Sequence, residues 1–581
     1  MVAESNGLYL GLDLSTQSLD AVVIDLDDAL ESAFEASVNF ETDLPHYGTK
    51  SGFIYDPESK RAVAPTLMFA EALELVLERL RSAKCPFERI RAVSVSAQQH
   101  GSVYWQRPPH LPDTEKDSQK SLVACLQEPT TAFAVPFSPI WADASTTAAC
   151  RAIEAAYPGG ARQLARDTGS RAYERYTAAQ VVNLALHQPA AYRQTQRIQV
   201  ISAGMVSILC GNWCAEDVAD ASGTLWLQLG ALRPRWAPKA LAATEQAAGL
   251  ESGTLHGKLA ESPVLSFTAA GPIAPYFCHR FGFRPECLVV TGTGDNPSSA
   301  AGLAMRLGDV CISLGTSDTA FGRTSSCEPQ LFGHVFRSSL DPLAYMPILV
   351  FSNGSLTRER IRGPDRSWED FDASLERTPA GNQGLLALLT FVDEILPRLP
   401  AGLMYFAQIE TESTSSALAE LKLALLRPED VASHDAVVRA VVEQRALAIR
   451  YYGERIGLPF PPQRVLLTGG ASQSRGIRKV IADVLGAPVY VLERGKASLD
   501  AHVTPWNTAA RGAALRAAYV QRGEQQEFAD WASSIHAVRY RRVAEPNPDA
   551  FQLYTSVMLP AYARFEALVD AQSRTGPVSS A

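Results

Sequence analysis

The stretch "LYLGLDLSTQSLDAVVIDLDD", residues 8–28, alternates apolar and other residues on both sides of a short polar break at "STQS". Alternation with a period of two is typical of β-strands, so the stretch predicts a hairpin. A second stretch, "GDVCISLGTSDTAFGRT", residues 308–324, has the same form. Its "CISLGTSD" shares a leucine, a small residue and a threonine with "GLDLSTQS" in the first. We therefore expect two related halves that each open on a phosphate-sized turn.

A third stretch, "RVLLTGGASQSRGIRKVIADVLGAPVYVLE", residues 464–493, reads as strand, Gly-Gly turn, helix and strand. This order predicts a parallel α/β unit. A helix is expected just before it, over residues 434–457, and another over 61–82. The two glycines would let a flat ring or a sugar pack against bare backbone, and the helix near Ser474 would offer its N-terminus to an anion. Because 581 residues exceed a single core, we expect an α/β protein of at least two domains.

The overall composition excludes several classes of protein. The chain carries 53 basic and 62 acidic residues, a net charge of -9, which gives no support to a nucleic-acid surface. Its nine cysteines are scattered and fit mostly buried, reduced thiols rather than a disulfide scaffold. No apolar run reaches 18 residues, and the opening residues lack a basic region followed by an apolar run. We therefore expect no membrane association and a cytoplasmic location.

The stretch "TGTGDNPSSAAG", residues 291–302, places an acid before an expected helix. Pro297 suits the first helical position, which predicts Asn296 as the N-cap and Asp295 just outside the helix. The helix dipole would then hold the pKa of Asp295 low and keep the carboxylate ionised. Such a group suits phosphoryl transfer, in which the attacking hydroxyl loses its proton late. The alternative is an aspartate that only fills the turn.

Two further polar positions follow predicted strands. Asp13 ends a strand just before Ser15 and Thr16, where a carboxylate can hold Mg²⁺ directly or through water. The alternative is a plain polar turn. In "SAQQHG", residues 96–101, His100 follows two amides and is suited to a polyhydroxy ligand, or else satisfies a core carbonyl. The chain has no GxxxxGK[ST] motif, so hairpin turns of two domains would have to hold a nucleotide.

Eight motifs in this order resemble the FGGY family of carbohydrate kinases, and within it the animal-type enzymes that act on xylulose. They are "GLDLSTQS", "SVSAQQHG", "IWADAST", "TGSRAYERYTAAQ", "GDNPSSAAG", "SLGTSDT", "NGSLTRERIR" and "LLTGGASQSRGIRKVIADVLGAPVYV". The resemblance runs from about residue 8 to 571. It implies two actin-like ATPase (ribonuclease H-like) domains that flank a central cleft. Residues 1–284 would bind sugar, 285–522 would bind nucleotide, and 523–581 would form a helical tail on the core.

The activity implied by the resemblance is ATP-dependent phosphorylation of D-xylulose to D-xylulose 5-phosphate with Mg²⁺, in a monomer or homodimer. Asp295 would be the catalytic base and would hold the sugar together with His100, Arg171 and Asn296. Asp13 would organise the metal and the phosphates. The other nucleotide-site positions implied by the motifs are Thr16, Gln17, Gly315, Thr316, Trp368, Gly469, Gly470, Ala471 and Ser474.

The chain departs from the family pattern at several positions. Asp20 stands where many members have a basic residue, and Ser474 stands where the adenine motif has asparagine. Ser145 in "IWADAST" and the Gln99–His100 pair argue against a glycerol kinase. Two alternatives stay open: another sugar or polyol kinase of the same fold, acting on ribulose, gluconate or glycerol, and a catalytically inactive sugar-binding protein.

Overall fold

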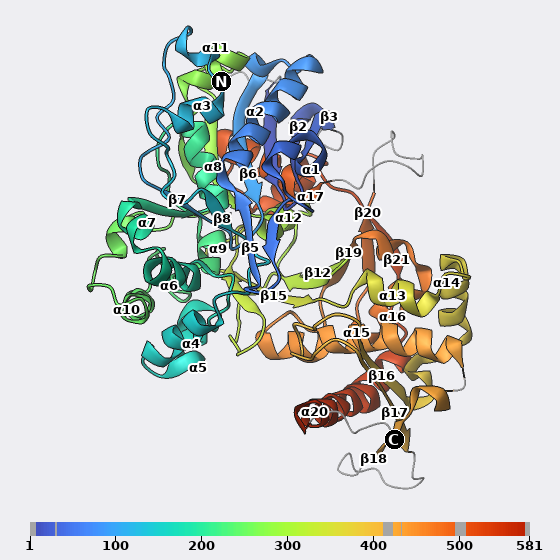
Figure 1. Cartoon of the computed structure of the whole chain (residues 1–581). Helices are drawn as coiled ribbons and strands as arrows, with labels where there is room; N and C mark the ends of the chain where they lie inside the picture. Colours follow the sequence, from blue (N-terminus) through green and yellow to red (C-terminus); the bar gives the residue numbers. More distant parts are fainter. Residues whose placement is uncertain (1–6, 29–31, 411–421, 432, 494–506, 576–581) are drawn as a thin grey trace.

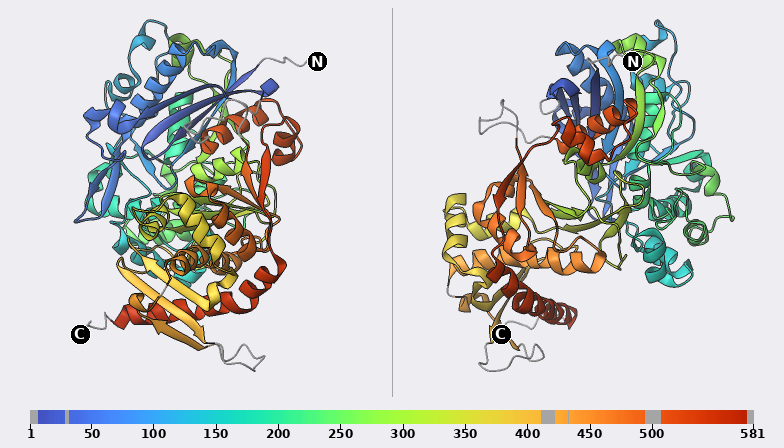
Figure 2. Two further views of the ribbon diagram at one scale, coloured as in Figure 1. Left: turned by 90° about the vertical axis from the view of Figure 1, so that its right-hand side faces the viewer. Right: turned by 180° about the vertical axis from the view of Figure 1, so that it is seen from behind.

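The computed structural model describes residues 7–28, 32–410, 422–431, 433–493 and 507–575. The chain forms two lobes, each built on its own large β-sheet (Figure 1). Blue and green segments dominate the upper lobe and yellow and orange segments the lower one, and both rotated views keep this division (Figure 2).

The first sheet has six strands in the order β10-β11-β6-β1-β2-β3. Their bounds are β1 Leu8–Leu14, β2 Ser18–Asp25, β3 Ser32–Asn39, β6 Ile90–Ala97, β10 Ala269–Pro272 and β11 Leu288–Gly294. The predicted first hairpin is confirmed, because β1 and β2 pair antiparallel from Leu8 and Asp25 to Leu14 and Leu19. On its other side β1 pairs in parallel with β6, and β6 pairs in parallel with β11.

The second sheet has seven strands in the order β14-β15-β13-β12-β19-β20-β21. Their bounds are β12 Asp309–Leu314, β13 Asp318–Gly322, β14 His334–Arg337, β15 Tyr345–Phe351, β19 Arg464–Thr468, β20 Val489–Leu492 and β21 Tyr540–Ala544. From β15 to β21 the neighbours pair antiparallel, antiparallel, parallel, parallel and antiparallel. From β3 to β10 the first sheet has the same sequence of pairings. The predicted internal repeat is therefore confirmed as two sheets of one topology.

Helices cover both sheets, and short strands form smaller sheets beside them. The helices are α1 Phe40–Asp43, α2 Thr66–Ser82, α3 Leu122–Gln127, α4 Thr147–Ala156, α5 Gly160–Thr168, α6 Thr177–His187, α7 Pro189–Gln194, α8 Ile201–Cys210, α9 Val218–Ala221, α10 Pro238–Ala247, α11 Pro275–Phe281, α12 Asp295–Gly302, α13 Ser355–Arg362, α14 Trp368–Arg377, α15 His434–Ile456, α16 Arg475–Leu485, α17 Thr508–Gln521, α18 Phe528–Ser534, α19 Pro548–Leu553 and α20 Leu559–Thr575. The remaining strands are β4 Ile54–Asp56, β5 Arg61–Pro65, β7 Ser102–Trp105, β8 Phe137–Pro139, β9 Arg197–Val200, β16 Leu385–Thr390, β17 Leu403–Glu410 and β18 Lys422–Leu426.

Two of the helices expected from periodicity agree with the structure to different degrees. The helix predicted over 434–457 is α15, which ends at Gly457 in the left-handed region at φ 92°. The helix predicted over 61–82 begins only at Thr66, because residues 61–65 pair as β5 with β4 and β8. Pro65 precedes the helix, a position where its missing N–H is not needed.

The helix α17 lies far along the chain yet packs against β1 and β6 of the first lobe (Figure 1). Gly11 of β1 permits this, because a Cβ there would come within 2.5 Å of the Ala514 backbone nitrogen. The helix α12 packs in turn on α17, where a Cβ on Gly512 would lie 2.7 Å from the Gly302 nitrogen. This crossing fixes the position of α12 on the first sheet.

Several elements lie outside the domain that the sequence assigned to them. The strand β11 and the helices α12 and α17 all join the first lobe, so this lobe extends past the boundary predicted at residue 284. The segment 523–575 is not only helical, because β21 completes the second sheet. The long helix α20 packs against α15.

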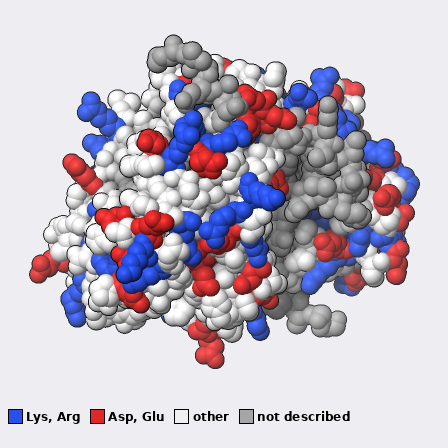
Figure 3. Space-filling view, turned by 90° about the horizontal axis from the view of Figure 1, so that it is seen from above, with Lys and Arg blue, Asp and Glu red and all other residues white. Residues whose placement is uncertain are grey.

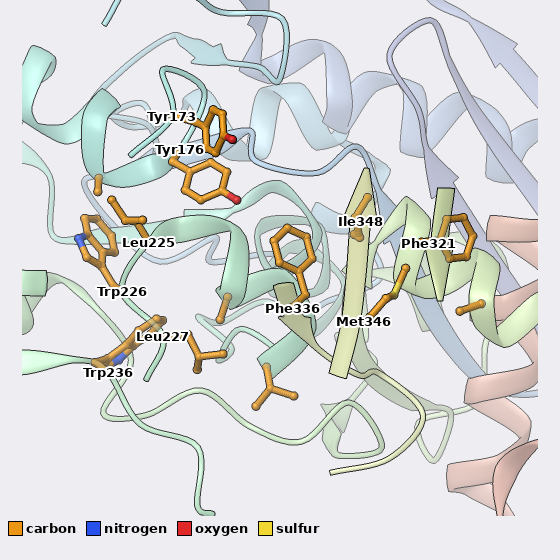
Figure 4. Close-up of a cluster of buried hydrophobic side chains, with 14 of the residues drawn as sticks. Tyr173, Tyr176, Leu225, Trp226, Leu227, Trp236, Phe321, Phe336, Met346 and Ile348 are labelled. Carbon is orange, nitrogen blue, oxygen red and sulfur yellow. The ribbon is translucent and has the colours of Figure 1, made fainter. Parts of the chain in front are cut away.

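The edge strand β14 joins the two lobes. Its Val335 N–H donates to the Gly169 carbonyl at 2.9 Å, and the Arg337 N–H donates to Ser222 Oγ at 3.1 Å. One buried cluster crosses this junction and brings Tyr176 of the first lobe together with Phe336 of β14 (Figure 4). The lobes therefore share a packed core at this edge.

Acidic and basic side chains are intermixed over the face seen from above (Figure 3). Among the described residues, no helix combines the length and the apolar character that a membrane crossing requires.

Candidate active site

Three parallel strands of the first sheet end at the same edge. The pairing sets Asp13 of β1 opposite Ser96 of β6, and Ser96 opposite Thr293 of β11. The first turn, the loop that contains His100, and Asp295 therefore all leave the sheet side by side. Ligands of parallel sheets commonly bind beyond the carboxyl ends of the strands, which makes this edge the candidate site.

Asp295 is the first residue of α12, and the N-cap is Gly294 at φ -68° and ψ 162°. The prediction that Asn296 caps the helix is therefore wrong. The reason is local: Asp295 Oδ1 accepts the Asn296 N–H at 2.7 Å and the Asn296 Nδ2 at 3.0 Å, so the carboxylate itself occupies the first turn. Pro297 is the third residue of α12 and therefore lies in the first turn, where N–H groups have no helical partner and its missing donor costs little.

The environment of Asp295 raises its pKa to about 7, so the prediction of a low pKa is wrong. Burial is the largest cause, and the neighbouring Asp13 carboxylate adds to it. The hydrogen bonds from Asn296 act in the opposite direction but do not compensate. A carboxylate with a pKa near the operating pH is well matched to general base catalysis.

Asp13 is buried at 2% exposure, and polar groups surround its carboxylate. Oδ1 accepts Ser96 Oγ at 2.6 Å, and Oδ2 accepts Ser15 Oγ at 2.7 Å and Asn507 Nδ2 at 3.0 Å. Asn507 also donates to Asp20 at 2.9 Å and caps α17. Asp20 therefore faces Asn507 and Asp13 rather than open solvent. Sequence reasoning missed Asn507, although an asparagine directly before a helical pattern is a cap signal.

The residues near Asp13 fit a magnesium ion. Mg²⁺ usually binds one or two carboxylates, keeps several waters and takes its other ligands from substrate phosphates. Asp13 and Asp20 offer two carboxylates held by one amide. Among the described residues, no group of three or more His, Cys, Asp or Glu side chains could form a closed metal site. These residues therefore fit an open magnesium site, in which water and substrate phosphates supply the remaining ligands.

His100 lies in the loop that follows β6, beside the strand that leads to Asp295, and its imidazole is neutral. Its backbone is in the left-handed region at φ 70°, and its ring stacks on Tyr176 with centroids 4.7 Å apart. Burial and the charge of Arg175 lower the pKa of His100 well below its usual value. Nδ1 lies 3.4 Å from the Gly223 carbonyl, which can only accept, so in this contact Nδ1 carries the proton. Nε2 is then left as an acceptor for a hydroxyl group.

Gln99 connects the His100 loop to the helix that carries Asp295. Its Oε1 accepts Asn296 Nδ2 at 2.9 Å. A Cβ on Gly294 would lie within 2.7 Å of Gln99 Nε2, so only glycine allows this close approach. The structure thus brings together three of the four predicted sugar-site residues, namely His100, Asp295 and Asn296.

Arg171, the fourth predicted sugar residue, forms a two-pronged ion pair with Glu154 of α4. Its Nε and Nη2 donate to the two carboxylate oxygens at 3.0 and 2.9 Å. Arg171 also lines a cavity of about 380 Å³ with Tyr173 and His334. No hydrogen bond or ion pair among the described residues joins it to His100 or Asp295.

A second arginine of the same motif, Arg175, contacts the ring cluster around His100. Its Nη2 lies 2.6 Å from His334 Nε2, which must therefore be the acceptor. The proton of His334 then sits on Nδ1, 2.7 Å from the Tyr176 hydroxyl. Arg175 thus fixes His334, and through it the tyrosine on which His100 stacks. Sequence reasoning did not single out Arg175, because nothing local distinguishes it from Arg171.

The second sheet presents two turns side by side. The strands β12 and β19 pair in parallel, with Ser313 opposite Thr468, so the turn that starts at Gly315 adjoins the turn that starts at Gly469. Gly469 has φ 82° and packs on the Leu314 backbone, which excludes a side chain. The predicted residues Thr316 and Gly470 are exposed, and Gly315 and Ala471 are half-buried.

Two predicted nucleotide residues belong to the first lobe. Gln17 is exposed in the turn between β1 and β2. Thr16 Oγ1 accepts the Trp141 indole N–H at 2.8 Å. Trp141 comes from the "IWADAST" motif and is 43% exposed, so this motif covers the first phosphate-sized turn.

Trp368 and Ser474 lie at the starts of two helices that pack together. Trp368 begins α14 with 41% of its surface exposed, and the Arg362 guanidinium lies 4.8 Å from its ring centre. Ser474 is the N-cap of α16, accepts the Ile477 N–H at 3.1 Å and donates to Asp372 of α14. The short side chain of Ser474 therefore serves the cap. Sequence reasoning missed Asp372, which joins the two helices.

A model of the FGGY family of carbohydrate kinases, C-terminal domain, matches residues 310–520. The chain is 42% identical over 521 residues to "Xylulose kinase 2" of Arabidopsis thaliana, which covers 88% of this chain and 87% of the relative. It is 36% identical to "Xylulose kinase" of Rattus norvegicus, over 98% of each chain.

The solved structure of ligand-bound xylulose kinase from Lactobacillus acidophilus superposes with a TM-score of 0.74 at 16% identity, over 98% of this chain and 100% of that one. This likeness confirms the predicted fold class, two actin-like ATPase domains. Together with relatives that match nearly the full length, it leaves one conclusion: the chain belongs to the FGGY family of carbohydrate kinases.

Proposed function

We propose that this chain transfers the terminal phosphoryl group of ATP to D-xylulose, forming D-xylulose 5-phosphate and ADP. One observation carries the proposal: Asp295, with a pKa of about 7, stands near Asp13 at the edge of the first sheet from which the loop that contains His100 also leaves. The substrate is taken from the printed names of relatives that cover nearly the whole chain.

In the proposed reaction Asp295 accepts the proton of the sugar's terminal hydroxyl as that oxygen attacks the γ-phosphorus. The bond between this phosphorus and the ADP oxygen breaks, and the pair of electrons leaves with ADP. His100 and Asn296 hold the sugar hydroxyls, His100 through Nε2. Neutral groups suit this task, because they can form hydrogen bonds without a charge that must be desolvated.

The nucleotide is proposed to lie between the two sheets. Its phosphates would meet the turns that contain Thr16, Gln17, Gly315 and Thr316, and its adenosine would lie near Trp368, Gly469, Gly470, Ala471 and Ser474. Mg²⁺, held by Asp13, would neutralise charge on the phosphates. The lobes must approach each other around the substrates, because water in the open site would compete with the sugar for the phosphoryl group.

A panel assay tests the proposed substrate. ADP release would be measured with D-xylulose, D-ribulose, gluconate and glycerol at equal protein concentration. We expect kcat/KM to be highest for D-xylulose. A higher value for another member of the panel would assign a different sugar kinase, and sugar-dependent thermal shifts without ADP release would favour an inactive sugar-binding protein. A cytoplasmic location and the oligomeric state, monomer or homodimer, stay predictions.

The pH dependence follows from the raised pKa of Asp295. The base must be ionised, so kcat/KM for the sugar is expected to fall about tenfold per pH unit below pH 7.

The stability of the fold depends on pH in the opposite direction. Folding raises the pKa of Asp295 from its ordinary value of 3.8 to about 7. The contribution of this shift to the free energy of unfolding is therefore complete below pH 4 and is lost as the pH rises through 7. Asp295→Asn should therefore raise the melting temperature relative to wild type at pH 8 but not at pH 4, by differential scanning calorimetry.

Arg171→Met is expected to raise KM for D-xylulose about tenfold or more, with a smaller change in kcat. The loss of a hydrogen bond from a charged donor accounts for this magnitude. Initial rates at varied sugar concentration give the measurement. The matched variant is Arg175→Met, which would act indirectly by releasing His334 and Tyr176. An unchanged sugar KM in Arg171→Met together with a raised one in Arg175→Met would move the assignment to Arg175.

A further inference from the structure

The turn between β12 and β13 has a fixed backbone orientation. Leu314 pairs with Asp318, so only residues 315–317 form the turn. The Gly315 carbonyl accepts the Ser355 N–H at 2.9 Å and Arg358 Nη2 at 3.3 Å, both from the "NGSLTRERIR" motif. In a trans peptide the carbonyl and the following N–H point in opposite directions. With the Gly315 carbonyl turned inward, the N–H of the exposed Thr316 is turned toward the open side.

Two buried arginines and two buried acids lie beneath this turn. Arg358 donates to both oxygens of Asp318 at 2.8 and 3.0 Å, and Asp318 is fully buried. Arg445 of α15 lies 3.2 Å from Asp318 and 3.1 Å from Glu394. The four side chains, Asp318, Arg358, Glu394 and Arg445, form one network with balanced charge, which we call the turn network.

The turn network connects four separate chain segments, namely β13, α13, the loop between β16 and β17, and α15. Asp318 begins β13, directly after the turn that contains the Gly315 carbonyl. Glu394 accepts the Ser352 N–H at 2.7 Å, which brings in the segment before α13. A Cβ on Gly354 would lie 2.5 Å from the Thr316 carbonyl oxygen, so this segment packs directly beneath the turn. A buried charge that loses its partner is strongly destabilised, so the network resists any rearrangement of the turn.

We propose that Arg358 and Asp318 are positioning residues for the nucleotide phosphates: they lock the Gly315–Thr316 peptide so that its N–H faces the phosphates before the nucleotide binds. The inference rests on the proposed function, in which residues 315–317 meet these phosphates. The physical reason is preorganisation. A Thr316 N–H that already points at the phosphates needs no reorientation as negative charge develops on them during the reaction. Without the network, this peptide can rotate and the donor is lost.

The test compares two buried arginines of one lobe. Arg358→Met removes the lock but leaves Arg445 to pair with Asp318. The matched control is Arg439→Met: Arg439 is buried on α15 and donates to Glu443 at 2.6 Å and to the Tyr554 hydroxyl at 3.1 Å. Both variants break a buried ion pair, so both should lower the melting temperature. Only Arg358→Met should weaken ADP binding in the presence of Mg²⁺, by about tenfold or more in titration calorimetry.

Steady-state kinetics separate the roles further. Arg358→Met should raise KM for ATP and lower kcat by about 10- to 100-fold, while KM for the sugar changes less than about twofold. Arg358→Lys keeps the positive charge but loses the paired guanidinium hydrogen bonds to Asp318. It should therefore fold and show an ADP affinity between those of wild type and Arg358→Met. If both Arg358 variants bind ADP as tightly as wild type, the inference is overturned and the proposed function stands. Failure of the wild-type protein to bind ADP would overturn both.

Discussion

Asp295→Asn is expected to lower kcat for D-xylulose phosphorylation by about 10²- to 10⁴-fold. The amide keeps the size of the side chain but cannot accept a proton from the attacking hydroxyl. Sugar binding should largely persist, because His100 and Gln99 still hold their positions through Gly223 and Asn296. Turnover is measured by ADP release, and binding by the shift of melting temperature with D-xylulose.

A surface acid provides the control for this variant. Asp435 has a pKa lowered to about 2 by its pair with Arg377 and lies on the exposed start of α15. Asp435→Asn should leave kcat unchanged and cost no more than about 1 kcal/mol of stability, as is usual for surface ion pairs. Turnover of Asp295→Asn at the wild-type rate would exclude Asp295 as the base.

Asp13→Asn is expected to lower kcat by about 10²-fold or more, because the phosphates would lose the carboxylate that we propose to hold their metal. The half-saturating Mg²⁺ concentration should rise in the same variant. With its oxygen in the place of Oδ2, the asparagine can still accept from Ser15 and Asn507, and its NH2 group can donate to the Ser96 hydroxyl, so the loss should fall on catalysis more than on folding. Rates at varied Mg²⁺ and fixed ATP give both quantities.

Asp20→Asn is the matched control for Asp13→Asn, since Asn507 donates to both acids. Like Asp13→Asn, this variant removes one negative charge, but from the other acid to which the Asn507 side chain donates. We expect its kcat to stay within about tenfold of wild type, because Asp20 lies on β2, one strand further from the row of Asp13, Ser96 and Asp295. Equal losses in the two variants would mean that the metal is shared between both carboxylates.

The sequence predicts local features of the fold well. Both hairpins could be predicted because alternation and turn residues lie within about 20 residues of each other. The end of α15 could be predicted from Gly457, which takes the left-handed conformation there. The lobe to which β11 and α17 belong could not be predicted, because strand pairing and helix packing join segments that are hundreds of residues apart.

In the candidate site, too, local features could be predicted from the sequence and features that depend on long-range packing could not. Asp13, His100 and Asp295 could be singled out as candidates because each lies at or just after the end of a predicted strand. The pKa of Asp295 could not, because the burial that raises it comes from neighbouring strands and not from its own helix. The ion pair of Arg171 with Glu154 and the contact of Arg175 with His334 likewise depend on how separate helices and β14 pack.

The crossing of α12 and α17 has a consequence for biosynthesis. Until residue 521 has left the ribosome, the nascent chain lacks the helix that covers β1 and β6 and against which Gly302 packs. A ribosome paused between residues 302 and 508 would carry strands with one bare apolar face, the kind of surface that chaperones capture. The first lobe therefore cannot complete its folding before the second lobe has been synthesised, and Asp295, the proposed base on α12, is secured only after residue 521 has been made.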